Sequence, residues 1–496
     1  MSADLTFLAF DLGASSGRAV LCRLRDGRFL LEEVHRFPNG PVQVLGHLHW
    51  NVLQLFEEIK VGLRIGGRES DLAGVALSTW GVDSALLDRG GELLGLPYCY
   101  RDDRTAGIME KVFTRMPREE IFTRTGIQFM PLNTLYQLYA TKILKPELLR
   151  ATGTLLMMPD LFVYWLAGRK GSELTIASTT QFLDAQTRAW SQEIFDRLEL
   201  PFDILPEIYP SGSVVGELLP EIADEAGLRK AWIVAPASHD TASAVASVPA
   251  SVERFAYISS GTWSALGVLV PEPVINQVTL DENFTNECGL AGRYMLRKNI
   301  MGLWPLQECR RIWAQAGQVY DYTDLVQLAE QAAPFRVIIE PDHESFLPPG
   351  DMPARIAAFC RQTGQEAPAG PGAITRCILE SLALKYRFVL DKLEKALGWR
   401  GEILHIVGGG SKNRLLCAMT ASATGRPVLA GPSEATTLGN AVIQARALGA
   451  INSLEEGRQL ILASSELERY EPREQEPWES FYARYLKIKE QTITLL

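Results

Sequence analysis

Asp240 and His239 lie in the segment ASHDTASA, where one carboxylate and one imidazole are surrounded by small residues. A carboxylate close to a hydroxyl group can accept its proton as a general base, and the small neighbours leave room for a polar ligand. His239 is an alternative base. Aspartate also caps helices frequently, and a capping Asp240 would still present its carboxylate outward. We expect Asp240 to accept a proton from a bound hydroxyl group.

The segment FDLGASSGRAV, residues 10–20, places glycines and serines between two apolar runs. A hairpin with residues 13–17 at its tip can turn successive N–H groups and two hydroxyls toward one point, which suits phosphate oxygens. Arg18 adds a cation, and Asp11, at the end of the first run, is placed to hold hydrated Mg²⁺. An ordinary hairpin turn has the same residue types, so both interpretations stay open here.

Two common nucleotide-binding motifs are absent from this sequence. The chain has no G-x-x-x-x-G-K-[ST] phosphate loop. The segment VGGGSKN follows a predicted strand, but Asn413 stands where a dinucleotide fingerprint that begins at Gly408 needs its third glycine. We interpret this glycine loop as backbone that lies against a flat adenine or ribose.

Polar residues also follow apolar runs beside aromatic ones, in STWGVD (residues 78–83) and YRDDR (residues 100–104). An aromatic face with fixed polar partners suits a carbohydrate. A core tryptophan and a solvated charge run are the alternatives.

The elements that carry these motifs begin with three strand signals, Leu5–Phe10, Ala19–Leu24 and Arg28–Phe37. Apolar residues at helical spacing over 52–63 and an apolar strand over 72–77 come next. This order predicts a mixed sheet rather than strict alternation of strands and helices.

A related pattern begins halfway along the chain, with strands over 255–259 and 263–270 joined by the turn at 260–262. A long helix is predicted to begin after Pro371-Gly372 and to end at Gly398, followed by a strand over 403–407. Two similar openings predict two related domains with an interdomain cleft, and the segment VASVPASV, residues 245–252, fits the boundary.

The composition excludes several classes of protein. A chain of 496 residues is longer than a single hydrophobic core usually supports. Its net charge of −10 excludes a broad surface for binding nucleic acid or an anionic membrane. The start, MSADLTFLAF, lacks a secretory pattern, and no apolar run reaches the roughly 18 residues of a membrane span. We expect a cytoplasmic monomer or small homo-oligomer that acts on small molecules, with no nucleic acid, membrane or obligatory protein partner.

Seven cysteines without C-x-x-C spacing give no signal of a zinc site or a disulfide framework. Cys360 and Cys377 bracket a loop rich in proline and glycine, and the sequence leaves a bond between them undecided.

Segments along nearly the whole chain resemble the FGGY carbohydrate kinases. They are FDLGASSGR, STWGVDSALLD, GLPYCYRDDRT, GIQFMPLNTLYQL, MMPDLFVYWLAG, TIASTTQF, ASHDTASAV, YISSGTWS, NIMGLW, LHIVGGGSKN and EATTLGNA. The resemblance implies an α/β fold of two actin-like, ribonuclease H-like ATPase domains. We expect a sugar-binding domain over residues 1–247 and a nucleotide-binding domain over residues 248–496. These domains are expected to close over ATP and a ketose.

The resemblance also implies site residues. The expected nucleotide contacts are Ala14, Ser15, Ser16, Gly17, Arg18, Thr262, Gln307 and Gly409. The expected sugar contacts are Gly81, His239, Asp240, Thr241 and Asn299, with Asp240 as proton acceptor and Asp11 at the metal.

The implied reaction is transfer of the γ-phosphoryl group of ATP, with Mg²⁺, to the O1 hydroxyl of L-rhamnulose. L-Fuculose and D-xylulose are alternative acceptors. A non-catalytic, nucleotide-dependent binding protein on the same fold is a different class of answer, and the carboxylate at Asp240 argues against it.

Overall fold

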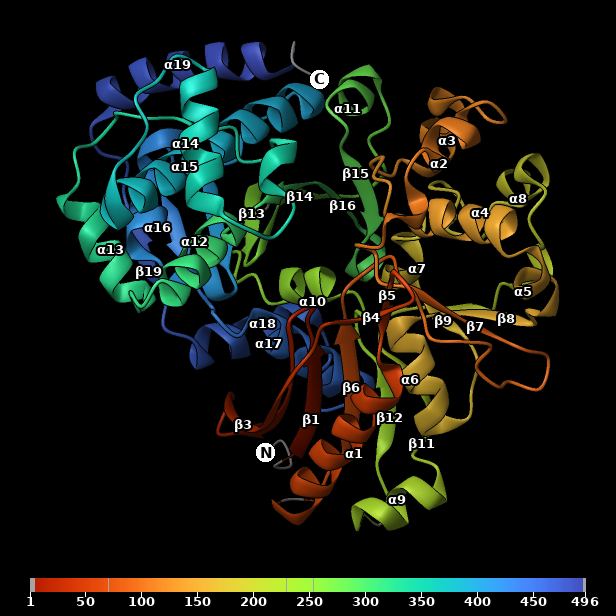
Figure 1. Ribbon diagram of the computed structural model, residues 1–496. Coiled ribbons are helices and arrows are strands. Elements are labelled where there is room, and N and C mark those ends of the chain that lie inside the picture. The colour runs from red at the N-terminus through yellow and green to blue at the C-terminus, as the bar shows by residue number, and fades with distance from the viewer. Residues whose placement is uncertain (1–4, 70, 229, 253, 494–496) are drawn as a thin grey trace. The chain divides into compact units, whose positions relative to one another are not determined.

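The computed structural model describes residues 5–69, 71–228, 230–252 and 254–493 (Figure 1). The chain folds into two compact units. Unit 1 comprises residues 1–249, 269–296 and 435–465, and unit 2 comprises residues 250–268, 297–434 and 466–496. Residues 1–4 and 494–496 lie outside the described residues. The first of these ranges belongs to the start MSADLTFLAF, for which no secretory pattern was found in the sequence.

Unit 1 is built on a six-stranded sheet with the order β11-β12-β6-β1-β2-β3. Its strands are β1 (Leu5–Leu12), β2 (Ser16–Arg25), β3 (Arg28–Pro38), β6 (Gly74–Thr79), β11 (Ser213–Glu217) and β12 (Trp232–Ala235). β1, β2 and β3 pair antiparallel in chain order, whereas β6 runs parallel to β1 and to β12. The three consecutive strands and the mixed sheet predicted from the sequence are confirmed. The strand predicted over 72–77 begins later, because Leu72 is buried in the core without joining the ladder.

Helices cover both faces of this sheet, because alternate residues of a strand point to opposite faces. Phe10 packs in one core cluster with α1 (Val52–Glu69), and Phe7 packs in another with α17 (Ala435–Ala447). Gly62 brings α1 close to the sheet, since a Cβ there would lie 2.6 Å from the Phe10 ring. The result is a layer of strands between two layers of helices, whose elements can be followed in Figure 1.

Unit 1 has further helices and short strands, many of them between β6 and β11. These helices are α2 (Ile108–Phe113), α3 (Arg118–Thr125), α4 (Thr134–Leu144), α5 (Pro146–Ala151), α6 (Met158–Ala167), α7 (Leu174–Ser178), α8 (Gln192–Leu198), α9 (Pro220–Ala226), α10 (Asp240–Ala246), α11 (Gln277–Asp281) and α18 (Leu454–Ser464). Its short strands are β4 (Pro41–Val44), β5 (His47–Trp50), β7 (Ser84–Leu87), β8 (Thr154–Met157), β9 (Ser172–Glu173), β10 (Ile208–Tyr209) and β15 (Thr285–Cys288).

Unit 2 repeats the central pattern of unit 1. Its strands are β13 (Phe255–Ser260), β14 (Trp263–Val270), β16 (Tyr294–Met301), β17 (Ile403–Val407), β18 (Val428–Ala430) and β19 (Glu468–Tyr470). They belong to a sheet with the order β15-β16-β14-β13-β17-β18-β19. β13 and β14 form an antiparallel hairpin, and β17 and β18 continue parallel to β13. The order β14-β13-β17-β18 therefore matches β2-β1-β6-β12, as the two similar openings of the sequence predict.

The helices of unit 2 include the long one predicted from the sequence. They are α12 (Trp304–Gln315), α13 (Tyr322–Gln331), α14 (Met352–Gln362), α15 (Gly370–Leu397), α16 (Arg414–Thr424) and α19 (Gln475–Ile493). α15 has proline in its first turn and ends at Gly398, which adopts φ 72° as a left-handed C-cap. Among the described residues of both units, no helix combines the length and the apolar character needed to cross a membrane.

The seven cysteines are all buried free thiols. Cys360 of α14 and Cys377 of α15 lie in hydrogen-bonding contact, so the two helices meet at this pair. The bond between them that the sequence left undecided is not formed in this structure.

Candidate active site

Asp240 is the first residue of α10, which follows the parallel strand β12. His239 is the N-cap, with extended φ and ψ of −75° and 120°, so the alternative interpretation of Asp240 as the capping residue does not apply. The Asp240 carboxylate accepts from the Thr241 N–H at 2.5 Å and from the Thr241 hydroxyl at 3.1 Å. Its side chain is 31% exposed, which leaves the carboxylate accessible to a ligand. Two predicted sugar contacts, Asp240 and Thr241, therefore bind each other.

The pKa of the Asp240 carboxyl is raised above its ordinary value. Burial is the largest cause, the neighbouring His239 opposes it, and the charge of Asp11 adds to the rise. A carboxylate with a raised pKa is a stronger base, which matches the role expected of Asp240.

Asp11, the residue before the last of β1, lies opposite Arg18 on β2, and the two side chains form an ion pair. The Arg18 guanidinium donates to one Asp11 oxygen through Nη2 at 2.8 Å and through Nε at 3.1 Å. The predicted metal ligand and the predicted phosphate-binding cation thus lie together, 16% and 18% exposed.

The hairpin tip between β1 and β2 is held from the end of β3. The Gly13 N–H donates to the Ser16 carbonyl at 2.9 Å, which closes the turn. Asn39 donates its side-chain amide to the Gly13 carbonyl at 2.7 Å and its N–H to the Ser15 carbonyl at 3.2 Å. Gly17 is required, since a Cβ there would lie 2.2 Å from the Phe37 ring. Sequence reasoning missed Asn39, although the turn signal Pro-Asn-Gly marks its position.

Gly81 lies in a clamped turn after β6. A Cβ on Gly81 would lie 3.1 Å from the Thr179 side chain. The next residue, Val82, has φ 67°, which is rare for a β-branched residue and costs free energy. Its N–H donates to the Thr179 hydroxyl at 3.1 Å, and its carbonyl accepts from the Thr134 hydroxyl at 2.6 Å. These hydrogen bonds hold a strained backbone beside a predicted sugar contact.

The fully buried Asp83 brings the two aromatic and polar segments together. One carboxylate oxygen accepts from the indoles of Trp50 at 2.6 Å and Trp80 at 2.9 Å, and from the Tyr100 N–H at 3.2 Å. The other oxygen accepts from the Gln137 amide at 2.8 Å. Burial raises the pKa of Asp83 to about 6, although these donors oppose the rise. The buried Trp80 indole therefore donates to this carboxylate. This matches the alternative interpretation of STWGVD, in which the tryptophan belongs to the core.

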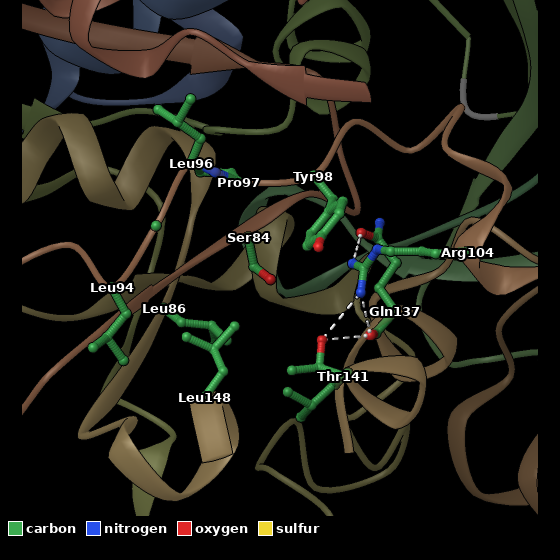
Figure 2. Close-up of a pocket in the computed structure, with 12 residues that line it drawn as sticks. Ser84, Leu86, Leu94, Leu96, Pro97, Tyr98, Arg104, Gln137, Thr141 and Leu148 are labelled. Atoms are coloured by element: carbon green, nitrogen blue, oxygen red, sulfur yellow. Dashed lines mark hydrogen bonds between the residues drawn. The ribbon is translucent and has the colours of Figure 1, made fainter. Parts of the chain in front are cut away.

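Arg104 borders a hollow next to this cluster, which is partly open to solvent and is shown in Figure 2. Its guanidinium donates to the Gln137 carbonyl, the Gln137 side chain and the Thr141 hydroxyl at 2.9–3.0 Å, and it lies 4.0 Å from the Tyr98 ring centre. The lining residues are Ser84, Leu86, Leu94, Gly95, Leu96, Pro97, Tyr98, Arg104, Gln137, Leu138, Thr141 and Leu148. Arg104 belongs to the segment YRDDR that suits a carbohydrate, whereas none of the sugar contacts that the family resemblance implies lines this hollow.

The backbone before α10 is anchored by Glu173, which sequence reasoning missed. Its buried carboxylate accepts from the Ser238 N–H at 3.0 Å and from the Thr175 hydroxyl at 2.6 Å. The Thr175 hydroxyl oxygen in turn accepts from the His239 N–H at 3.2 Å. This network fixes the place of His239 and therefore of Asp240.

The His239 imidazole lies between two carboxylates. Its Nδ1 is 3.1 Å from Oε2 of Glu287, and its Nε2 is 3.5 Å from Oδ1 of Asp240. Glu287 belongs to β15, and no pattern in the sequence predicts its role, because this contact depends on a strand from a distant part of the chain.

Two predicted nucleotide contacts of unit 2 are hydrogen-bonded. Thr262, in the β13–β14 turn, donates its hydroxyl to the Gln307 side chain at 3.1 Å. The Thr262 carbonyl accepts from the N–H groups of Gly302 at 3.1 Å and Trp304 at 3.2 Å. Asn299, the remaining predicted sugar contact, lies on β16 and accepts from Arg297. Thr262 and Gln307 thus form one polar group at the start of α12.

The glycine loop after β17 packs against the end of β13. A Cβ on Gly410 would lie 2.0 Å from the Ser260 hydroxyl oxygen, whereas a Cβ on Gly409 would meet nothing within 4 Å. Gly409 therefore offers open backbone, as a contact to a flat nucleoside requires.

The donor sets fit a nucleotide with a magnesium ion. Mg²⁺ prefers carboxylate and water oxygens, and Asp11 and Asp240 are two partly accessible carboxylates whose charges interact. Phosphate oxygens suit the Gly/Ser hairpin and the Arg18 fork.

Comparison with known protein families gives two matches that together span most of the chain. Residues 6–247 match the family model described as FGGY family of carbohydrate kinases, N-terminal domain, and residues 256–448 match the C-terminal domain of that family. The chain belongs to the FGGY family of carbohydrate kinases. The resemblance, the kinase activity and the pairing of ATP with Mg²⁺ predicted above are therefore confirmed for this FGGY kinase.

Its relatives are similar over nearly their whole length. A rhamnulokinase of Bacteroides thetaiotaomicron is 43% identical over 481 residues, which cover 97% of this chain and 98% of the relative. A rhamnulokinase of Oceanobacillus iheyensis is 38% identical, covering 93% and 97% of the two chains. The crystal structure of a ligand-bound xylulose kinase from Lactobacillus acidophilus has a TM-score of 0.82 at 18% identity, covering 98% of each chain. This likeness confirms the predicted α/β fold.

Proposed function

We propose that this FGGY kinase transfers the γ-phosphoryl group of ATP to the O1 hydroxyl of L-rhamnulose, giving L-rhamnulose 1-phosphate and ADP. The two relatives named rhamnulokinase, at 43% and 38% identity, support this acceptor. The observation that carries the chemistry is the Asp240 carboxyl, which is accessible, raised in pKa and influenced by the charge of Asp11.

The proposal divides the work between two domains. Residues 1–247 form the sugar-binding domain and residues 248–496 the nucleotide-binding domain, and each also supplies contacts to the other ligand, residues 14–18 to the nucleotide and Asn299 to the sugar. The proposed sugar contacts are Gly81, His239, Asp240, Thr241 and Asn299, and the proposed nucleotide contacts are Ala14, Ser15, Ser16, Gly17, Arg18, Thr262, Gln307 and Gly409. The mutual contacts of Asp240 with Thr241 and of Thr262 with Gln307 support these groupings.

In the proposed mechanism Asp240 accepts the proton of the sugar hydroxyl as that oxygen attacks the γ-phosphorus. Asp11 would hold the magnesium ion, which supplies charge neutralisation for the transferring group. Arg18 offers two parallel N–H donors to phosphate oxygens, in the geometry that it now directs at Asp11. Because the transition state of phosphoryl transfer is loose in most analyses, positioning and electrostatics contribute more than proton removal.

A panel of sugars tests the acceptor. The purified protein with MgATP is offered L-rhamnulose, L-fuculose and D-xylulose, and ADP formation is followed by a coupled assay. We expect the highest kcat/KM with L-rhamnulose. A higher value with either other ketose would reassign the acceptor within the FGGY family. ADP formation that is equal with and without sugar would remove the kinase mechanism itself.

We also propose a cytoplasmic location, with the protein acting as a monomer or small homo-oligomer without an obligatory protein partner. Seven buried free cysteines support a reducing compartment. Light scattering coupled to size-exclusion chromatography tests the oligomeric state, and a mass above that of a tetramer would contradict the proposal.

A further inference from the structure

Glu287 is held by its neighbours on β15. The Asn286 N–H donates to the Gly126 carbonyl at 2.9 Å, and the Cys288 N–H donates to the Ser178 hydroxyl at 3.0 Å. Glu287 itself is only 5% exposed. With the residue on each side fixed and the side chain buried, the Glu287 carboxylate has little freedom to move away from His239.

His239 is fixed from the opposite direction. Its N–H donates to the Thr175 hydroxyl, it pairs as an isolated bridge with Thr79, and it is 6% exposed. The ring therefore has a defined place between the carboxylates of Glu287 and Asp240. Two anchored side chains from different elements meet here, which is the arrangement of a preorganised site.

The distances from the two ring nitrogens of His239 to Glu287 and Asp240 indicate which nitrogen carries the proton. A neutral imidazole carries one N–H, which can sit on either nitrogen. Hydrogen bonds from an imidazole N–H to a carboxylate have heavy-atom distances of about 2.7–3.2 Å. The 3.1 Å between Nδ1 and Glu287 lies in that range, although the ring must turn before these two buried atoms are aligned as a hydrogen bond, whereas the 3.5 Å between Nε2 and Asp240 lies outside it.

We propose that Glu287 is a positioning residue that accepts the Nδ1 proton of His239 and so leaves Nε2 unprotonated beside Asp240. This inference rests on the proposed function in one respect, that His239 contacts the sugar. In this tautomer Nε2 is a hydrogen-bond acceptor, so the site presents two acceptors, Nε2 and the Asp240 carboxylate, to the hydroxyl groups of the acceptor sugar. Hydroxyls are the donors that such a pair selects.

The same tautomer favours the proton transfer. Once Asp240 has taken the proton of the attacking hydroxyl, its new O–H can donate to the free Nε2, provided that the present 3.5 Å between the two atoms shortens. The opposite tautomer would place an N–H there, which binds ionised Asp240 and weakens it as a base. Glu287 thereby acts on the reaction through His239, without contact with the reacting atoms.

Nitrogen NMR reads the tautomer directly. The chain has six histidines, so selective ¹⁵N-histidine labelling gives few signals, and a His239→Gln variant assigns the one of interest. Near neutral pH we expect the His239 signals of a protonated Nδ1 and an unprotonated Nε2. In Glu287→Met, which keeps the bulk and removes the acceptor, we expect these signals to move toward the Nε2–H form.

A second histidine and carboxylate pair provides the matched control. Nε2 of His35 lies 2.6 Å from Glu58, and both belong to unit 1. Glu58→Met should change the His35 signals and leave those of His239 unchanged. A wild-type His239 protonated on Nε2, or one whose signals are the same in Glu287→Met, would overturn the inference. The wild-type measurement decides the matter even if Glu287→Met fails to fold.

Kinetics separate this inference from the proposed function. Loss of one oriented hydrogen bond should raise the KM for L-rhamnulose about threefold to tenfold in Glu287→Met, with the KM for ATP within twofold of wild type. Glu287→Asp, which keeps a carboxylate, should recover part of the loss. A tautomer change without any change in sugar kinetics would support the positioning role and contradict the sugar contact of His239. A sugar KM effect without a tautomer change would overturn the inference.

Discussion

Asp11 and Arg18 face each other across the β1–β2 hairpin and form a two-pronged ion pair, with contacts of 2.8 and 3.1 Å to a single carboxylate oxygen. The guanidinium is therefore already oriented as a fork before a phosphate arrives. This geometry gives Arg18 a role that lysine cannot fill, because an ammonium group is a point charge.

Arg18→Lys tests that role. We expect the variant to bind MgADP on the order of tenfold more weakly, because the parallel pair of N–H donors is lost. Isothermal titration calorimetry measures the change. Arg23→Lys, on the same strand and paired with Glu32 away from the turn, is the matched control and should bind MgADP normally. Equal affinity for MgADP in Arg18→Lys and Arg23→Lys would show that Arg18 does not bind the nucleotide.

Asp240→Asn tests the proton acceptor. The amide cannot take a proton from the hydroxyl group, so kcat should fall by about 10²–10⁴-fold. Binding of MgADP should remain, since the backbone of α10 is held by Glu173 and Thr175. The exposed Asp203→Asn serves as a control and should leave turnover unchanged. Near-normal turnover in a folded Asp240→Asn protein would place the base elsewhere.

Two adjacent glycines give a paired test of the loop after β17. Gly409→Ala should fold with wild-type stability, because its Cβ enters open space, and should weaken binding of MgADP at the proposed nucleoside contact. Gly410→Ala should unfold at lower denaturant concentration, because its Cβ meets the Ser260 hydroxyl at 2.0 Å. Urea titration and calorimetry separate the effects. A Gly409→Ala variant with normal MgADP affinity would contradict the proposed contact.

Asp83 predicts a pH dependence of stability. Its folded-state pKa of about 6 lies above the ordinary value of 3.8, so the fold favours the protonated carboxyl. The stability from this group is full below the ordinary pKa and is lost as the pH rises through about 6. We expect a loss of roughly 3 kcal/mol between these limits, at about 1.4 kcal/mol per pKa unit.

The Asp83→Asn variant isolates that contribution. Its pH profile of unfolding free energy should lack this loss, so the difference between wild type and variant should change with pH from 4 to 7. The variant should also be destabilised by about 1–3 kcal/mol, because its NH₂ group would face the Gln137 amide that now donates to Asp83. Parallel profiles for the two proteins would show that Asp83 keeps an ordinary pKa.

Local patterns were enough to predict much of the framework. The alternating runs at the start predict β1, β2 and β3, and the glycine signal predicts the end of α15 at Gly398, whereas its start, predicted after Gly372, lies at Gly370. These features depend on residues close in sequence. The turn at Ser260-Gly261-Thr262 was found in the same way, from its likeness to the first hairpin.

The supports of the candidate site could not be predicted in this way. Glu173, Glu287 and Asn39 act on residues that reach them only after distant strands and loops pack together. The sequence also does not reveal that His239 caps α10, because histidine is not among the common capping residues and His239 caps without a side-chain hydrogen bond.

The cluster around Asp83 joins a titrating carboxylate to the two indoles of Trp50 and Trp80, whose ring centres lie 4.3 Å apart. Protonation of that carboxylate weakens two indole hydrogen bonds at once, in a place that water does not reach. The intrinsic fluorescence of the protein should therefore follow the ionisation of Asp83, and a difference spectrum against Asp83→Asn separates it from the other tryptophans. Trp80 therefore serves as a built-in spectroscopic probe directly next to Gly81 in the chain.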